Sequence, residues 1–437
     1  MLRPVQLVAV IFFTVSGGPY GLEPLLTYGG PGGAMLLLLL TPILWDIPTV
    51  LTVLELNSMM PVNGGYYQWV KRAMGLRWAF YEGWWTWLYT FVDLAIYPVL
   101  FVQYASFFMP GLEVYKIPIC LFIIWSCAGL NILGVVPVGK ASLLLGALVL
   151  APFLVLFTVG FHSLTPAAFA ANPLSLRGLG LTSIGMGLYT VMWNMLGWDN
   201  TTTYAEEVEK PARSYLISIS VSFLLILGIY VLALRTAQGS GIDPGLLKEK
   251  GFPALGILMG GRWLGILLAA GGMASSIGLF AAVLLSVSQV PKAMADDRLL
   301  PEGLSALHPR FNTPYLSIIF CSVVVSGMIL WTFMDLVVID IILYGAALFL
   351  EFITLVVLRI RAPDENRPFR IPLNITGICL MLVLPVGVYV LALGGALSDS
   401  GNTWKPALFA LVALLTAEIV WTGIRLKKAR VDKIDYI

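Results

Sequence analysis

The chain of 437 residues is 59% hydrophobic and only 11% charged, with a formal net charge of +2 and a mean hydropathy of +0.89. Soluble domains carry about 25% charged residues, so this composition excludes a soluble globular protein, and the small net charge indicates no nucleic-acid partner. Apolar windows of about 20 residues recur along the chain, which predicts an all-α integral membrane protein with a single transmembrane domain over residues 1–437.

The hydropathy pattern predicts about twelve transmembrane helices, of which the first and the sixth are broken. Their expected ranges are 6–29 (broken), 33–58, 78–109, 116–132, 139–161, 180–205 (broken), 214–236, 263–290, 314–333, 336–358, 373–397 and 404–426. Most of the 26 Lys and Arg residues then fall on the side that holds both termini. By the positive-inside rule we expect a multi-pass protein of the cell membrane with both termini in the cytoplasm.

The first predicted helix is interrupted at Ser16–Gly21, where three glycines and one proline occur within six residues. Glycine and proline both destabilise a helix, and proline also removes a backbone donor, so the helix should unwind here. The freed amides of Gly17, Gly18 and Tyr20 or Gly21 could face a substrate carboxylate, and the preceding carbonyls could face an ammonium group or Na⁺. The alternative is a packing kink, in which the glycines serve close helix contact.

The sixth predicted helix is interrupted at Asn194–Asp199, where Gly197 stands among polar residues between Trp193 and Trp198. This break comes five predicted helices after the first one. Such spacing favours two inverted repeats of five helices, with residues 1–161 as the first repeat, 180–358 as the second and 373–426 as two additional helices.

Carboxyl groups accompany both breaks, since Glu23 follows the first and Asp199 closes the second. A carboxylate in mid-membrane costs roughly 2.5–3.5 kcal/mol, so each needs a cation, which the substrate amine or a proton could supply. Alternatively, these groups reach the interface or cap a half-helix. Asp93 lies four residues before Tyr97, which places both on one helical face. Weaker acidic candidates are Asp46, Glu55, Glu82, Asp340, Glu351 and Glu418.

Aromatic and hydroxyl side chains complete the predicted site. Trp193, Trp198, Tyr97 and Tyr344 could offer π faces to a cation or an apolar tail. Ser275 and Ser276 of the eighth predicted helix could complete a sodium site at the first break, although the small residues around them also suit close helix packing. The four cysteines lack metal-ligand spacing, so we expect neither a metal nor a cofactor.

Several stretches together resemble one known family over nearly the whole chain: Ser16–Glu23, Pro61–Tyr66, Asp93–Phe101, and Trp198–Asp199 with Ala205–Val208. They are similar to the amino acid-polyamine-organocation transporters, most of all to the polyamine uptake branch best known from plants. The resemblance implies a leucine-transporter-like fold of five-plus-five inverted repeats with two extra helices, and alternating access around a central site. It also implies substrate contacts at Ser16–Gly18 and Trp193–Asp199, and coupling to H⁺ rather than Na⁺.

The leading functional hypothesis is a secondary active transporter that takes up polyamines or related cationic amines, with Glu23, Asp199 and Asp93 neutralising the ammonium groups. One alternative is an L-type neutral amino acid transporter or exchanger, with or without coupling to sodium, and another is a non-transporting nutrient receptor. We expect neither a channel nor an enzyme, since the sequence has no filter-like repeat and no catalytic constellation. The expected partners are a small amine or amino acid and the lipid bilayer, and the sequence does not determine the oligomeric state.

Overall fold

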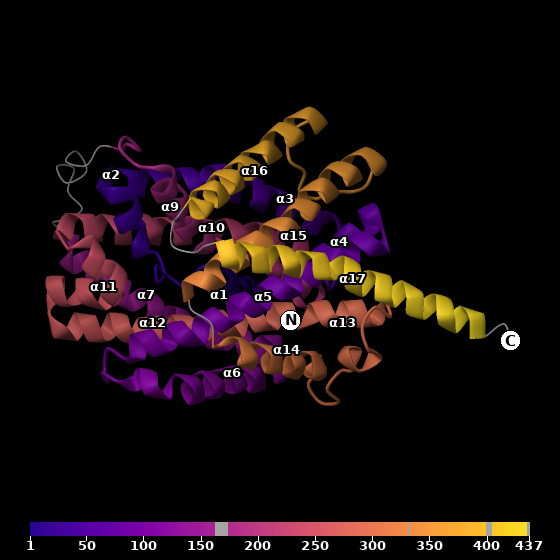
Figure 1. The fold of residues 1–437 in the computed structure, drawn as a ribbon, viewed down its shortest axis with the longest axis horizontal. Helices are drawn as coiled ribbons and strands as arrows, with labels where there is room; N and C mark the ends of the chain where they lie inside the picture. Colours follow the sequence, from indigo (N-terminus) through magenta and orange to yellow (C-terminus); the bar gives the residue numbers. More distant parts are fainter. Residues whose placement is uncertain (162–173, 331–332, 399–403, 435–437) are drawn as a thin grey trace.

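The computed structural model of the chain describes residues 1–161, 174–330, 333–398 and 404–434. Within these ranges the protein is helical, and its only strand-like features are two isolated bridges, Leu2 with Val208 and Asn63 with Tyr204. Most helices run along the long axis of the molecule (Figure 1). The predicted all-α class is thereby confirmed.

The first half of the chain contains two irregular stretches beside its α-helices. Its elements are α1 (Pro4–Val15), α2 (Pro24–Thr41), the π-helical turn η1 (Pro42–Asp46), α3 (Ile47–Met59), α4 (Gly65–Met74), α5 (Leu76–Ala105), the 3-10 turn η2 (Leu112–Tyr115), α6 (Lys116–Ile132) and α7 (Val135–Val159).

The second half follows with longer helices. Its elements are α9 (Leu181–Trp193), the 3-10 turns η4 (Asn200–Thr203) and η5 (Ala205–Glu207), α10 (Pro211–Ser240), α11 (Pro244–Gly260), α12 (Arg262–Val287), α13 (Gln289–Asp296), the 3-10 turn η6 (Glu302–Ser305), α14 (Tyr315–Met328), α15 (Phe333–Arg361), α16 (Ile375–Leu397) and α17 (Trp404–Ile434).

Nine helical stretches among the described residues are long and apolar enough to cross a membrane, judged by length and composition. The shorter apolar helices α1 and α14 come in addition. The end of the first predicted span and the start of the second both fall within α2, which is kinked at Gly30 (φ 58°, ψ −177°). From α2 the chain continues through η1 into α3. Residues 331–332 of the ninth predicted span lie outside the described residues. The number of transmembrane helices and the inverted repeat stay predictions.

Two helices were not expected from hydropathy, namely α4 and α11. The first is a short amphipathic helix with Lys71 and Arg72 in its last turn, and the second is kinked at Gly251. Both escape an apolar window because polar residues interrupt them. They lie at opposite ends of the molecule (Figure 1). We call the end with Leu2, α4 and α13 the terminal face, and the end with η2 and α11 the distal face.

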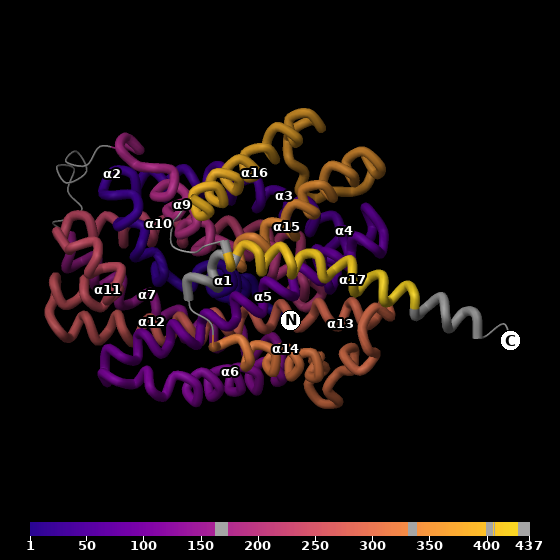
Figure 2. Tube along the Cα trace, in the orientation of Figure 1, coloured from indigo at the N-terminus to yellow at the C-terminus, as the bar shows by residue number. Residues whose placement is uncertain are grey.

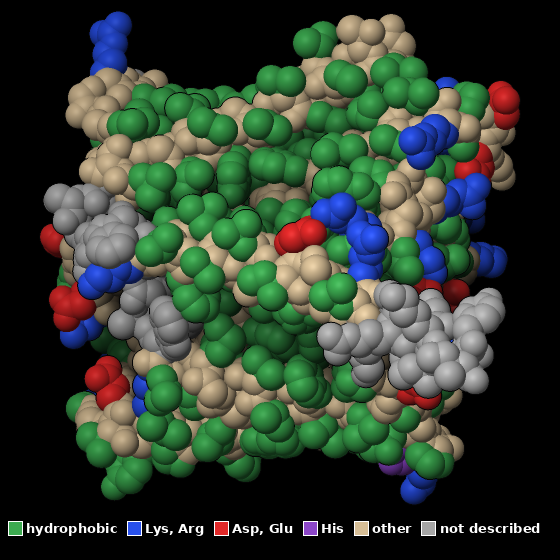
Figure 3. Space-filling model, turned by 45° about the vertical axis from the view of Figure 1, so that its right-hand side comes forward, with side chains coloured by type: hydrophobic (Ala, Val, Ile, Leu, Met, Phe, Trp, Pro, Cys, Tyr) green, Lys and Arg blue, Asp and Glu red, His purple; other side chains and the backbone are tan. Residues whose placement is uncertain are grey.

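The surface between these two faces is largely apolar. Figure 3 shows green side chains along the length of the molecule, with most charged groups toward its two ends. Large hydrophobic side chains such as Phe122, Leu224 and Leu380 are about 70% exposed, at 74%, 70% and 67%. In a lipid bilayer such side chains contact acyl chains, so this surface suits a multi-pass membrane protein.

Several polar contacts tie the terminal face together. The Leu2 amide donates to the Glu207 carbonyl at 2.8 Å, and the Gly64 amide donates to the Thr203 carbonyl at 2.7 Å. Asp297 accepts from Lys71 at 2.5 Å and from the Tyr67 hydroxyl at 2.6 Å. Burial, with a further effect of Asp297, raises the pKa of Tyr67, so its hydroxyl remains a donor.

A buried ion pair joins α3 to α15 near the terminal face. Glu55 is fully buried and accepts from two guanidinium nitrogens of Arg359. Arg367 lies 3.2 Å from the same carboxylate, and the Ile371 amide donates to it at 2.8 Å. The carboxylate thus holds α15 and the segment after it against α3.

Replacing Glu55 by Gln should lower the free energy of unfolding by about 3–5 kcal/mol, because it leaves the Arg359 charge buried without its counter-ion. The measurement is the apparent melting temperature of the detergent-solubilised protein, followed by size-exclusion chromatography after heating. Glu418→Gln is the control, since its pair with Arg77 is half exposed and should be worth less than about 1 kcal/mol. Equal losses in the two variants would contradict the role of the buried pair.

Candidate functional site

The first break lies between α1, which ends at Val15, and α2, which begins at Pro24. Gly17, Gly18 and Gly21 have φ values of 62°, 101° and 95°. Residues with side chains rarely adopt this region, so the glycines allow the path that the chain takes. The sequence-based prediction placed the interruption at these residues.

Three glycine amides of the first break are already bonded within the protein. The Gly17 amide donates to the Phe12 carbonyl at 2.9 Å, and the Gly18 amide donates to the Ser16 Oγ at 3.0 Å. The Gly21 amide donates to Glu23 Oε2 at 2.6 Å. The three glycine amides expected to face a substrate carboxylate therefore each have an acceptor in this conformation.

The second break follows α9 at Trp193 and contacts the first break directly. A Cβ atom at Gly21 would lie 2.4 Å from Cζ3 of Trp193, well inside van der Waals contact. Gly197 has a φ of 88°, and a Cβ there would lie 3.0 Å from the Thr14 carbonyl oxygen. Glycine at these positions lets the two breaks pack against each other.

Tyr230 of α10 holds the two breaks together. Its hydroxyl lies 2.7 Å from Ser16 Oγ in the first break and 2.7 Å from the Asn194 carbonyl oxygen in the second. This side chain is fully buried. Sequence reasoning missed Tyr230, because a tyrosine within an apolar helix gives no local signal of what its hydroxyl reaches.

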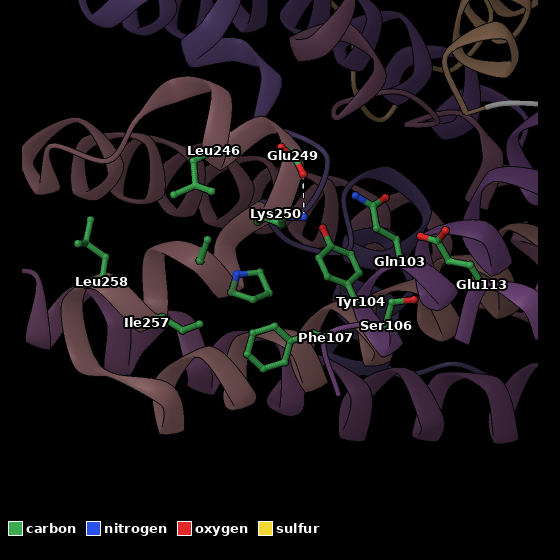
Figure 4. A pocket seen from close by; sticks show the side chains of 12 residues that line it. Gln103, Tyr104, Ser106, Phe107, Glu113, Leu246, Glu249, Lys250, Ile257 and Leu258 are labelled. Atoms are coloured by element: carbon green, nitrogen blue, oxygen red, sulfur yellow. Dashed lines mark ion pairs between the residues drawn. The ribbon is translucent and has the colours of Figure 1, made fainter. Parts of the chain in front are cut away.

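Glu23 lies on the distal side of the first break. Besides the Gly21 amide, its carboxylate accepts from the Tyr104 hydroxyl at 3.0 Å and from the backbone of Phe252 in α11. Tyr104 also lines a cavity of about 540 Å³ at the distal face. Figure 4 shows Tyr104 there between Lys250 of α11 and Gln103 of α5. Glu23 is thus a buried carboxyl one side chain away from the cavity.

Asp93, Tyr97 and Trp193 form a second group, as the sequence suggested for the first two. The Tyr97 hydroxyl donates to Asp93 one helical turn away, and the Trp193 side chain also donates to Asp93. Asp340 of α15, a weaker candidate, interacts electrostatically with Asp93. We call these four side chains the Asp93 group.

Asp199 forms a third group with Tyr344 of α15. The Tyr344 hydroxyl donates to Asp199 Oδ1 at 3.1 Å and lies 3.4 Å from the Gly197 amide, which donates to it. The carboxyl of Glu351 lies beside Asp199, so that a proton on either one would complete a hydrogen bond between them. Glu23 and Asp199 share no partner among the residues that the structure describes.

Three other predicted site residues lie apart from these carboxyl groups. The Trp198 indole donates to Asp46 of η1 at 3.0 Å, and its ring packs against Phe223 with centroids 5.7 Å apart. Ser275 donates to the Gly17 carbonyl at 2.6 Å and so does reach the first break. Ser276 instead donates to the Gly272 carbonyl of its own helix at 2.9 Å.

Nearly the whole chain, residues 2–416, matches the protein family described as amino acid permease. The chain belongs to the amino acid permease family. This confirms the resemblance seen in the sequence. The permease is accordingly a multi-pass membrane transporter and not an enzyme.

Similar proteins carry names that describe transport. Polyamine transporter RMV1 from Arabidopsis thaliana is 34% identical over 417 residues, which cover 94% of this chain and 82% of that protein. Polyamine transporter PUT1 from Oryza sativa subsp. japonica is 32% identical, with 96% of this chain and 78% of that protein covered. The serine/threonine exchanger SteT from Bacillus subtilis is 23% identical, with coverage of 96% and 95%.

Gly21→Ala should disturb the permease more than Gly111→Ala. Both glycines have similar φ values, 95° and 91°, so both variants lose about 1–2 kcal/mol to backbone strain. Only the Cβ at Gly21 would also collide with Trp193, because nothing lies within 4 Å of a Cβ at Gly111. Apparent melting temperature and substrate uptake should therefore both fall further for Gly21→Ala. Equal effects would contradict the close packing of the two breaks.

Proposed function

We propose that the permease is a secondary active transporter that carries polyamines or related cationic amines by alternating access and is coupled to protons. The observation that carries this proposal is a set of buried carboxyls without a cationic partner. Glu23 and Asp199 are buried and Asp93 is half-buried, and none of the three forms an ion pair with Lys or Arg within the described ranges.

The charge of these groups favours an amine over a neutral amino acid. An ionised carboxylate away from water needs a cation and hydrogen-bond donors, and a substrate ammonium group supplies both. A neutral amino acid also brings a carboxylate, which would need free amides at the first break. The three glycine amides there are bonded to Phe12, Ser16 and Glu23.

The similar proteins agree with this choice, since two of them are named polyamine transporters. We assign the first contact with an entering amine to Glu23, beneath the distal cavity, and the central contacts to Asp93 and Asp199. Tyr97, Trp193 and Tyr344 orient these two carboxyls. With the terminal face in the cytoplasm, as the positive-inside rule predicts, the distal cavity would open outward at the cell membrane.

We further propose H⁺ rather than Na⁺ as the coupling ion. Ser275 and Ser276 were the candidate sodium ligands, and their hydroxyls instead donate to the carbonyls of Gly17 at 2.6 Å and Gly272 at 2.9 Å. Neighbouring carboxyls such as Asp199 and Glu351 cannot both be ionised cheaply without a cation, so one of them readily holds a proton.

Purified permease in proteoliposomes should accumulate labelled putrescine or spermidine, and Asp93→Asn and Asp199→Asn should each lower this uptake at least about tenfold. The reason is that each variant removes a charge-assisted hydrogen bond to the ammonium group. Asp243→Asn is the matched control, because this exposed residue caps α11 and asparagine caps equally well. Uptake of neutral amino acids alone would overturn the proposal, and binding without any flux would favour a receptor.

A pH gradient that is acidic outside the vesicles should drive amine accumulation, and a proton ionophore should abolish it. A sodium gradient of the same size, imposed at equal pH, should have no effect. The measurement is initial uptake of labelled spermidine under each gradient. Uptake that follows sodium and ignores pH would refute proton coupling while leaving the amine substrate in place.

A further inference from the structure

Helices α5 and α15 pack in contact along the centre of the molecule (Figure 2) and carry polar residues in matching positions. Three pairs link the two helices: the rings of Tyr89 and Tyr344 are in contact, and Asp93 interacts electrostatically with Asp340 as Glu82 does with Glu351. Along α5 the members lie four and then seven residues apart in one direction, and along α15 they show the same intervals in the opposite direction. The helices are therefore antiparallel and in register, and these intervals keep each set on one helical face.

The outer members of this arrangement are two pairs of carboxyls. We call Asp93–Asp340 the distal pair and Glu82–Glu351 the terminal pair, after the faces toward which they lie. Eleven residues separate them on each helix, and a rise of about 1.5 Å per residue places the pairs about 16 Å apart. The rings of Tyr89 and Tyr344 lie between them, edge to face, with centroids 5.1 Å apart.

Both pairs contain buried oxygens that accept no hydrogen bond from the protein. These are both carboxyl oxygens of Glu351, one of Glu82 and one of Asp340, in side chains that are at most 1% exposed. Buried polar atoms normally have partners, so each of these four atoms is short of a donor.

An independent group from another helix points to the same place. Tyr66 of α4 is fully buried, its hydroxyl has no partner, and it interacts electrostatically with Asp199, Glu82 and Glu351. Asp199 adds a third carboxyl to the terminal pair through its contact with Glu351. No Lys or Arg in the described part of the chain forms an ion pair with any carboxyl of the two pairs.

We propose that the two carboxyl pairs are the two ends of one binding site for a linear polyamine, and that this site prefers a tetraamine to a diamine. This proposal rests on the proposed function, which requires an amine substrate but does not set its length. An ammonium group at each end would donate to the unpartnered oxygens, and an inner ammonium group would lie against the tyrosine faces. The terminal end has three carboxyls, so it can hold the coupling proton beside an ammonium group.

The length of the ligand follows from the separation of the pairs. A fully extended chain advances about 1.2 Å per bond, as the extended polypeptide does. The terminal nitrogens of putrescine are then about 6 Å apart, those of spermidine about 11 Å and those of spermine about 16 Å. Among these three amines, only spermine reaches from the distal pair to the terminal pair.

The test is competition against labelled spermine binding to the purified, full-length permease, with α,ω-diamines from four to twelve methylene groups. Affinity should rise with length and be highest near 1,12-diaminododecane, whose nitrogens are also about 16 Å apart. Glu82→Gln and Glu351→Gln should weaken spermine binding at least about tenfold more than putrescine binding, because putrescine can be held by the distal pair alone. Glu302→Gln, an exposed change of the same kind in η6, should alter neither.

One further variant and three outcomes distinguish a folding defect, failure of the two-ended site and failure of the proposed amine transport. Glu351→Asp keeps the charge and should retain the preference for long amines, which identifies a binding role if Glu351→Gln fails to fold. Equal weakening of putrescine and spermine, or affinity independent of chain length, would overturn the two-ended site while amine transport stands. Wild-type permease that binds amino acids but no amine of any length would overturn both proposals.

Discussion

Every backbone amide that a helix releases inside an apolar environment must find another acceptor, and this requirement organises the centre of the permease. The first break satisfies it with side chains that lie next to it in the chain, Ser16 and Glu23. Tyr230 and Ser275 then bind the break to α10 and α12. Because Tyr230 also reaches Asn194, the two breaks form one packed unit and not two separate flexible loops.

Several carboxyl oxygens on α5 and α15, in contrast, have no hydrogen-bond donor within the protein. The amides of Gly17, Gly18 and Gly21 are bonded within the protein, whereas oxygens of Asp340, Glu82 and Glu351 lack donors in buried surroundings. The buried carboxyl groups therefore need a positively charged partner that can donate hydrogen bonds to them. It is the physical basis for choosing an amine as substrate, and the separation of the two carboxyl pairs is the basis for choosing a long one.

The two faces of the molecule are closed to different degrees. At the terminal face, backbone bonds from Leu2 and Gly64 reach the segment after the second break, and Lys71 pairs with Asp297. At the distal face a cavity of about 540 Å³ reaches Tyr104, the partner of Glu23. The backbone bonds of Leu2 and Gly64 thus hold the terminal face together, and the Glu55–Arg359 pair joins α3 to α15.

The sequence by itself determined the membrane class, the positions of both breaks and the acidic character of the interior, because these depend on composition and on the local chemistry of glycine and proline. It also placed Asp93 with Tyr97, which are neighbours on one helix. Only the tertiary structure decided that Tyr230 joins the breaks, that Trp198 turns to Asp46, and that Asp340 and Glu351 face α5. These pairings join helices far apart in the chain, and their register is set by side-chain packing between helices, which no local pattern of residues records.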